Sequence, residues 1–203
     1  MYRAESAILL HQEGVMMIKK NISFLAIFLL ALSGCVQPPI APAPATPTYV
    51  YVGDNWRALD SLTPPVNSIQ LAVQAPEEGT LDQKIQFQVT PNDNGYLWIV
   101  QIDANDQVQL LFPNNEEPEN YIRVGNTITL PGRSGYYYYL DRPLGQNLLA
   151  FIITSEKNGI SQVLPPRIKD VLYKSRDSRK FIRGVKYRQQ QDWGVTKHVI
   201  TVR

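Results

Sequence analysis

The stretch "NGYLWIVQIDANDQVQLLFPN", residues 94–114, decides the fold, because it contains two strand patterns joined by a short polar turn. In residues 96–101 every second side chain points to the same side, as the two-residue period of a β-strand requires. One side carries Tyr96, Trp98 and Val100, and the other carries Leu97, Ile99 and Gln101. The second pattern covers residues 108–112, and Pro113 ends it because proline cannot donate to a sheet ladder. The stretch therefore predicts a β-hairpin.

The turn between the two strands, "DANDQ", is rich in side chains that accept hydrogen bonds. Asp103, Asn105 and Asp106 tolerate tight backbone and cap free amides, as hairpin loops require. The same oxygens are possible calcium ligands, but the further ligands of a twelve-residue calcium loop are missing. We interpret the segment as a turn and expect no metal site.

Further strand patterns follow this stretch and precede it, separated by turns rich in Gly, Asn and Asp. One segment differs, because apolar residues recur at helical spacing at about residues 166–179. We predict a mainly β fold for a single domain at residues 49–203: an antiparallel β-sandwich or small barrel with one amphipathic helix near the C-terminus. The other predicted strands are "KIQFQV" (84–89), "NTITL" (126–130), "YYYYL" (136–140), "LLAFIIT" (148–154) and "KHVITV" (197–202).

The hairpin stretch resembles the signature of an uncharacterised bacterial family, a domain of unknown function. The likeness lies in the Gly-Tyr opening, the aspartate at the turn and the Leu-Phe-Pro-Asn end; "GNTITLP", "DRPLGQNLLAFIIT" and "DWGVTKHVITV" then follow in the family's order. The resemblance spans about Ile69 to Val202. It implies a β-rich binding or scaffolding domain, found in some envelope lipoproteins and in others appended to kinases or peptidases.

Residues 1–34 have the pattern of a secretion signal. Lys19 and Lys20 precede about ten apolar residues, too few for a good spanning helix. "LSGC", ending at Cys35, resembles a bacterial lipoprotein signal, which implies cleavage before Cys35 and attachment of diacylglycerol and a further acyl chain. Val36 in place of aspartate favours the outer membrane of a Gram-negative bacterium, with the domain in the periplasm. The true start is expected at Met16 or Met17, with a long natural leader as the alternative.

Residues 35–48 form a proline-rich linker after the single cysteine. Its composition favours extended polyproline II and therefore a stalk, with a ligand for a proline-binding domain as the alternative. With no second cysteine, no disulfide is possible within the chain, and we expect no cofactor besides the covalent lipid.

The charge of the chain is polarised along its length. Residues 36–166 carry 6 Lys and Arg against 13 Asp and Glu, whereas residues 167–203 carry 11 against 3. The basic tail either neutralises the acidic body or forms a docking surface for an acidic partner or for anionic envelope polymer and lipid. Nucleic acid is not expected as the partner, because the signal sends the chain out of the cytoplasm. The candidate binding residues in this tail are Arg176, Arg179, Lys180, Arg183, Lys186 and Arg188.

The run "GYYYYL" adds two further candidate binding residues, Tyr136 and Tyr138. Alternate tyrosines on a strand face opposite sides, so two face out and could stack on sugar or on protein, or simply reach water. Catalytic patterns are missing, and His198 is the only histidine after residue 35. We expect no catalytic residues and no enzyme.

Together these features predict a lipid-anchored, non-enzymatic interaction module, an accessory or scaffold of an envelope or secretion assembly with an envelope protein as its partner. The alternative is a lipoprotein that binds cell-wall glycan (peptidoglycan).

The lipid anchor predicts that Cys35→Ser releases the protein from membranes, because the substitution removes the only thiol that can carry the lipid. Membrane flotation followed by immunoblotting measures this. A variant that still floats with the membrane would contradict the anchor.

Overall fold

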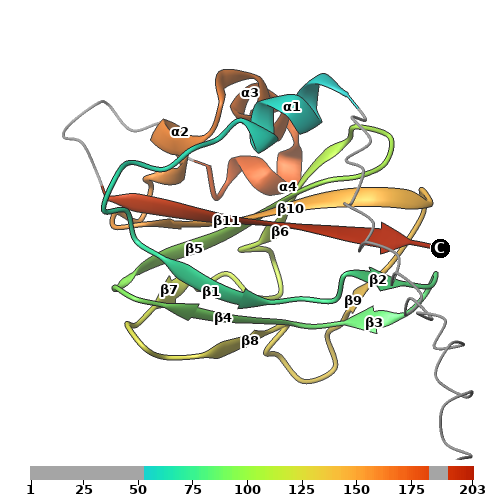
Figure 1. The fold of residues 1–203 in the computed structure, drawn as a ribbon, viewed down its shortest axis with the longest axis horizontal. Coiled ribbons are helices and arrows are strands. Elements are labelled where there is room, and N and C mark those ends of the chain that lie inside the picture. The colour runs from blue at the N-terminus through green and yellow to red at the C-terminus, as the bar shows by residue number, and fades with distance from the viewer. Residues whose placement is uncertain (1–52, 183–191) are drawn as a thin grey trace, which may run out of the picture. The chain divides into compact units, whose positions relative to one another are not determined.

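The computed structural model describes residues 53–182 and 192–203, which all belong to one compact unit, Thr48–Arg203. The predicted signal segment, the Cys35 lipid anchor and the proline-rich linker lie outside the described residues. The fold is mainly β with antiparallel sheets, as predicted, and the described strands do not close into a barrel (Figure 1).

The larger sheet has six strands, five of them on its main path. Their order is β2-β11-β10-β5-β6, with β7 paired to β5 beyond the end of β6. All pairs are antiparallel except β11 with β2. The strands are β2 (Glu78–Gly79), β5 (Gly95–Ile102), β6 (Val108–Phe112), β7 (Tyr121–Ile122), β10 (Gly145–Thr154) and β11 (Trp193–Val202).

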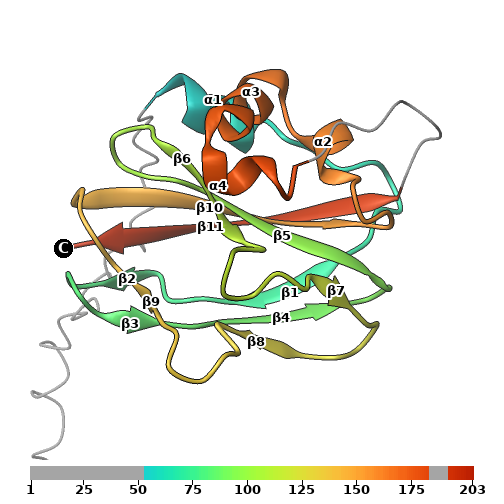
Figure 2. The ribbon, with the colours of Figure 1, turned by 180° about the vertical axis from the view of Figure 1, so that it is seen from behind.

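A second, smaller layer of strands lies against one face of this sheet (Figures 1 and 2). Three strands pair in the order β1-β4-β8, and β3 pairs with β9 along the continuation of the same layer. The strands are β1 (Leu71–Gln74), β3 (Lys84–Ile85), β4 (Phe87–Pro91), β8 (Ile128–Leu130) and β9 (Tyr138–Tyr139).

The first core fills the space between the two layers. Phe87 of β4 and Phe151 of β10 are both fully buried and meet edge to face, with ring centroids 5.4 Å apart. Such pairs add to the free energy gained by burying the rings. At the start of β11, Gly194 lets the backbone of Ile69 approach closely, because a Cβ there would overlap the carbonyl oxygen of Ile69.

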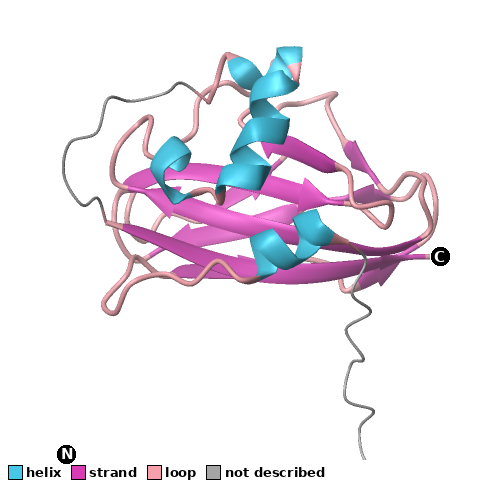
Figure 3. Ribbon diagram, turned by 90° about the horizontal axis from the view of Figure 1, so that it is seen from above, coloured by secondary structure: helices cyan, strands magenta, loops and turns pink. Residues whose placement is uncertain are grey.

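Helices cover the opposite face of the large sheet and enclose a second core (Figure 3). They are α1 (Asp54–Asp60), α2 (Ile160–Val163), α3 (Pro166–Lys174) and α4 (Arg176–Arg179). The predicted C-terminal helix is present as α3, and extended backbone at Ser175 separates it from α4. The sequence analysis missed α1 and α2, since both are short and are held by packing of residues such as Trp56 and Ile160.

The predicted hairpin turn at residues 103–107 is present, and its two aspartates hold backbone groups. Asp103 Oδ1 accepts hydrogen bonds from the N–H groups of Asn105 at 2.9 Å and Gln107 at 2.8 Å. The carboxylate of Asp106 accepts from the N–H groups of Asn55 at 3.0 Å and Trp56 at 2.8 Å, in the first turn of α1. Asp106 thus caps a helix about fifty residues earlier in the chain.

No helix in residues 53–182 or 192–203 is both long enough and apolar enough to cross a membrane.

The cap predicts that Asp106→Ala lowers the free energy of unfolding by about 1–2 kcal/mol, because the first turn of α1 loses both acceptors. Urea denaturation monitored by circular dichroism measures this. Asn105→Ala, in the same loop, is the matched control, since the Asn105 side chain makes no hydrogen bond in the described structure. Equal stability of the two variants would contradict the cap.

Candidate functional site

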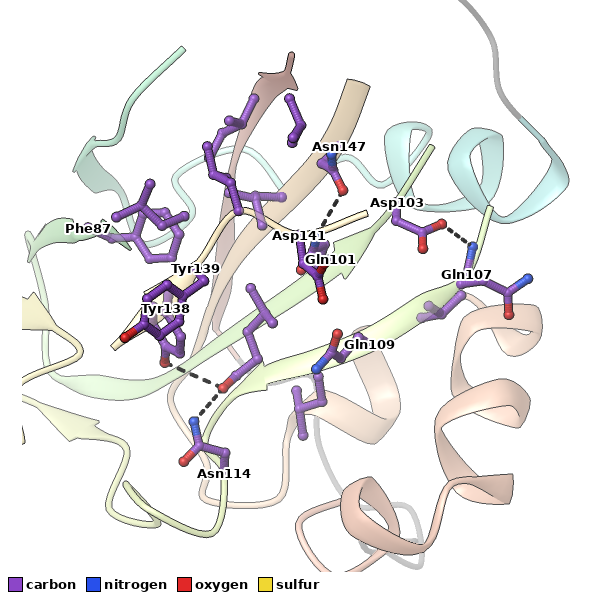
Figure 4. Close-up of a pocket in the computed structure, with 18 of the residues that line it drawn as sticks. Phe87, Gln101, Asp103, Gln107, Gln109, Asn114, Tyr138, Tyr139, Asp141 and Asn147 are labelled. Carbon is purple, nitrogen blue, oxygen red and sulfur yellow. Dashed lines mark hydrogen bonds between the residues drawn. The ribbon is translucent and has the colours of Figure 1, made fainter. Parts of the chain in front are cut away.

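A cavity of about 630 Å³ opens between the two layers, on the side where β6 ends the large sheet and β9 ends the small one. Its walls come from both layers, and the loop and first turn of α4 lie beside its mouth through Ser175, Asp177 and Ser178 (Figure 4). It is larger than two other hollows among the described residues, which have volumes of about 300 and 400 Å³. We take this cavity as the candidate binding site.

One wall of the cavity carries carboxamide side chains on strands of the large sheet. Gln101 of β5 donates a hydrogen bond from Nε2 to Oδ1 of Asn147 on β10, at 2.9 Å (Figure 4). Asn147 is only 5% exposed, and its own amide donates to the Gly145 carbonyl at 3.3 Å. Gln109 of β6 lies opposite Gln101 in the strand register and therefore on the same face. The carboxamides make part of this wall polar, whereas Leu149, Ile200 and Val202 continue the apolar inner face of the sheet beside them.

The opposite wall is aromatic. Tyr138 of β9 packs beside Phe87, with ring centroids 5.6 Å apart, and its hydroxyl lies 3.4 Å from the Leu111 carbonyl oxygen of β6. Asn114 donates to the same carbonyl at 2.7 Å and lies 3.3 Å from the Tyr136 hydroxyl. These contacts connect the edges of the two layers behind the cavity mouth.

The four tyrosines divide between two faces, as the strand period requires. Tyr138 is buried and Tyr136 half-buried, and both line the cavity. Tyr137 and Tyr139 face out, with 41% and 50% exposure, and the Lys84 ammonium lies 3.6 Å from the centre of the Tyr137 ring. The two tyrosines chosen from the sequence therefore line the inner part of the cavity, whereas the more exposed Tyr137 and Tyr139 also contribute to its lining.

Burial changes the acidity of the two inward tyrosines. Loss of hydration raises the pKa of the Tyr138 hydroxyl well above its ordinary value, and the nearby Glu117 carboxylate raises it further. The pKa of Tyr136 is raised for the same two reasons, with burial again the larger. Both hydroxyls are therefore neutral hydrogen-bonding groups at physiological pH.

Six of the eight C-terminal basic residues that the structure describes fall into two groups of three, and Lys169 and Lys174 of α3 belong to neither. Three form ion pairs with the acidic body of the chain: Arg167 with Asp54 at 3.5 Å, Lys197 with Asp60 at 3.4 Å and Arg203 with Glu78 at 2.6 Å. These pairs match the interpretation in which the tail neutralises the body.

The second group is the basic surface of α4, which we define as Arg176, Arg179 and Lys180. All three are exposed, and none pairs with a carboxylate within the described part of the chain. The other three candidates, Arg183, Lys186 and Arg188, lie outside the described residues. The α4 surface is therefore open to a partner.

The carboxylates and the histidine that could do acid–base work hold other groups in place. Glu117 Oε1 accepts from the backbone N–H groups of Gly132 at 2.6 Å and Arg133 at 3.0 Å, and Glu116 pairs with Arg133 at 2.7 Å. His198 Nε2 lies 2.9 Å from the Pro76 carbonyl oxygen. In residues 53–182 and 192–203, no three His, Cys, Asp or Glu side chains come together as metal ligands would.

The sequence analysis missed the carboxamide wall. The sequence does mark these positions, because a polar residue interrupts the apolar side of each strand pattern. On one face of β5, Gln101 follows Leu97 and Ile99. On one face of β10, Asn147 precedes Leu149 and Phe151. A strand pattern shows that a polar residue faces inward, but only the fold shows that the two interruptions meet.

The family described as "Domain of unknown function (DUF4384)" matches residues 80–157 of this chain. The match runs from the loop before β3 to the loop after β10, and so includes most of the cavity lining but not the residues from β11 and α4. A domain of unknown function is thus found here, consistent with the resemblance to an uncharacterised family. No curated protein and no solved structure matches the chain.

The raised pKa of Tyr138 predicts a loss of stability in alkali. An unfolded tyrosine ionises near pH 10, whereas the folded Tyr138 resists ionisation, so its contribution is complete below pH 10 and is lost as the pH rises further. Tyr138→Phe should therefore show a smaller fall in unfolding free energy between about pH 9 and pH 11 than the parent chain. Urea denaturation at each pH measures the fall.

Tyr139→Phe removes a hydroxyl from the same strand and is the control. Its unfolding free energy should fall at alkaline pH as much as that of the parent chain. If the unfolding free energy of Tyr138→Phe also falls as much as that of the parent, Tyr138 does not resist ionisation.

Proposed function

We propose that the protein is a lipid-anchored, non-enzymatic binding module of the cell envelope that docks an acidic protein partner through the α4 basic surface. One observation carries the proposal. The basic residues at either end of the C-terminal segment are paired with carboxylates of the body, whereas Arg176, Arg179 and Lys180 are exposed and unpaired in the described structure.

Electrostatics favours a docking role for such a surface. Exposed charges of one sign attract an oppositely charged surface and orient it during encounter. The α4 surface carries three cations with one acidic residue, Asp177, among them. An acidic partner would therefore gain contacts here without first breaking ion pairs inside the domain.

The anchor and the linker supply the rest of the mechanism. A lipid on Cys35 would hold the chain at the outer membrane of a Gram-negative bacterium, and the proline-rich segment would set the distance of the domain from that membrane. This arrangement suits an accessory or scaffold lipoprotein of an envelope or secretion assembly, with the domain in the periplasm. The support is the sequence pattern of residues 19–48.

Charge reversal on α4 tests the docking function. Arg176→Glu with Arg179→Glu should abolish capture of one dominant envelope protein in crosslinking of intact cells, followed by mass spectrometry, because the surface then repels an acidic partner. Both side chains are exposed, so the unfolding free energy should change by no more than about 0.5 kcal/mol.

Arg123→Glu with Lys157→Glu is the matched control, since it makes the same change in net charge outside α3 and α4 at two exposed residues that form no ion pair in the described structure. Loss of capture in both double variants would mean that overall charge matters and the α4 surface does not. Undiminished capture in the α4 variant would exclude this surface as the docking site.

A further inference from the structure

The cavity described above has the size and enclosure of a site for a small molecule. Its volume of about 630 Å³ lies within the roughly 300–1,000 Å³ of ligand pockets. It is bounded by the inner faces of two sheets, whose strands hold side chains more rigidly than loops do. A ligand that enters between β6 and β9 would meet fixed groups on both sides.

The inner face of the large sheet changes character where it reaches the cavity. On β5, Leu97 and Ile99 are fully buried in the first core, and the next residue on that face is Gln101. The antiparallel strand β10 shows the same change: Phe151 and Leu149 are buried in the first core, and Asn147 is the next residue on that face towards the start of the strand. A buried carboxamide costs free energy unless it is hydrogen-bonded, so a leucine would close this core at lower cost. The carboxamides thus leave a polar surface where the fold alone needs none.

Part of the hydrogen-bonding capacity of this wall is unused. Asn147 is satisfied by Gln101 and Gly145, whereas Gln109 makes no side-chain hydrogen bond within the described residues. Gln101 uses its amide group, and its carbonyl oxygen makes no hydrogen bond there. A carboxamide both donates and accepts, as a sugar hydroxyl does, and so it pairs with hydroxyls in either direction.

The other walls suit the same chemistry. Tyr138 on one side, with Tyr137 and Tyr139 near the mouth, offers aromatic surface to the C–H face of a pyranose ring. Asp103 and Asp141 add carboxylate oxygens that accept from hydroxyls. Aromatic, carboxamide and carboxylate groups together match a ligand that has both an apolar ring face and many hydroxyls.

Other ligand classes fit less well. Three aspartates and one arginine, Arg142, line the cavity, and this acidic balance opposes an anion. An extended peptide would add to the free edge of β6, but the Leu111 carbonyl on that edge already accepts from Asn114 and Tyr138. The edge is therefore partly closed to strand addition.

From these observations we propose that the cavity between β6 and β9 binds a neutral saccharide unit, which Gln101 and Gln109 recognise through its hydroxyl groups and the tyrosines recognise through its ring face. The cavity borders α4 through Asp177 and Ser178, but neither Arg176 nor Arg179 lines it, and the proposal does not depend on protein docking at the α4 basic surface. It would give the domain a second binding function, and it assigns a specific place to the glycan binding that the sequence raised as an alternative.

Isothermal titration calorimetry of the full chain in detergent tests the proposal. The probes are two neutral disaccharides, N,N′-diacetylchitobiose and maltose, and a hexapeptide of alternating Thr and Val. At least one disaccharide should bind with a Kd on the order of 1 mM or tighter. Binding of the chitobiose alone indicates an amino-sugar polymer such as wall glycan, and binding of maltose alone indicates a plain hexose polymer.

Gln109→Met keeps the side-chain length and removes the carboxamide, and it should weaken disaccharide binding about fivefold or more. Gln88→Met is the matched control, since Gln88 is an exposed strand glutamine on β4 outside the cavity. It should bind as the parent chain does, and equal melting temperatures of the two variants would show that both fold.

Failure of both disaccharides to bind would overturn the proposal, as would equal affinity of Gln109→Met and the parent. Binding of the peptide without either disaccharide would replace it with strand addition at β6. The Arg176→Glu, Arg179→Glu variant should bind the disaccharide unchanged, so failure of the docking function and failure of the saccharide site are distinguishable.

Discussion

The complete burial of the central strand β10 is the constraint on which the rest of the structure depends. From Leu148 to Thr154, side chains on both faces of this strand are buried, and β5 and β11 occupy both of its edges. A strand that is apolar on both faces must be covered on both. The small sheet covers one face and the helices cover the other, so three layers result from one ten-residue segment.

The same constraint explains where the candidate site lies. On β5 and β10 the apolar inner face ends at Gln101 and Asn147, and the cavity opens beside these two carboxamides. The neighbouring strand β11 continues the apolar face through Ile200 and Val202, which also line the cavity. Rigid strands on both sides give its polar groups fixed positions.

Two residues connect segments that are distant in the chain, and both also belong to the sequence signature. Asp106 in the β5–β6 turn caps α1, and Gly194 at the start of β11 lets the backbone of Ile69 approach closely. Each has a structural reason that needs no ligand or catalytic role. Packing does not explain the unpaired cations of α4 or the inward carboxamides, which are therefore the candidates for binding.

The sequence by itself determined the β class, the β5–β6 hairpin and the amphipathic character of α3, because alternation, turn residues and helical spacing are local properties of the chain. It also showed that charge is polarised, but not which cations are paired: Arg167 and Arg176 look alike in the sequence, and only the fold places Asp54 beside the first of them. The helix α1 likewise depends on an acceptor some fifty residues away. Only the tertiary structure decided the cavity, because its lining comes from separate strands. Strand register and the stacking of the two layers bring these strands together, and with them Gln101, Gln109, Asn147 and Tyr138.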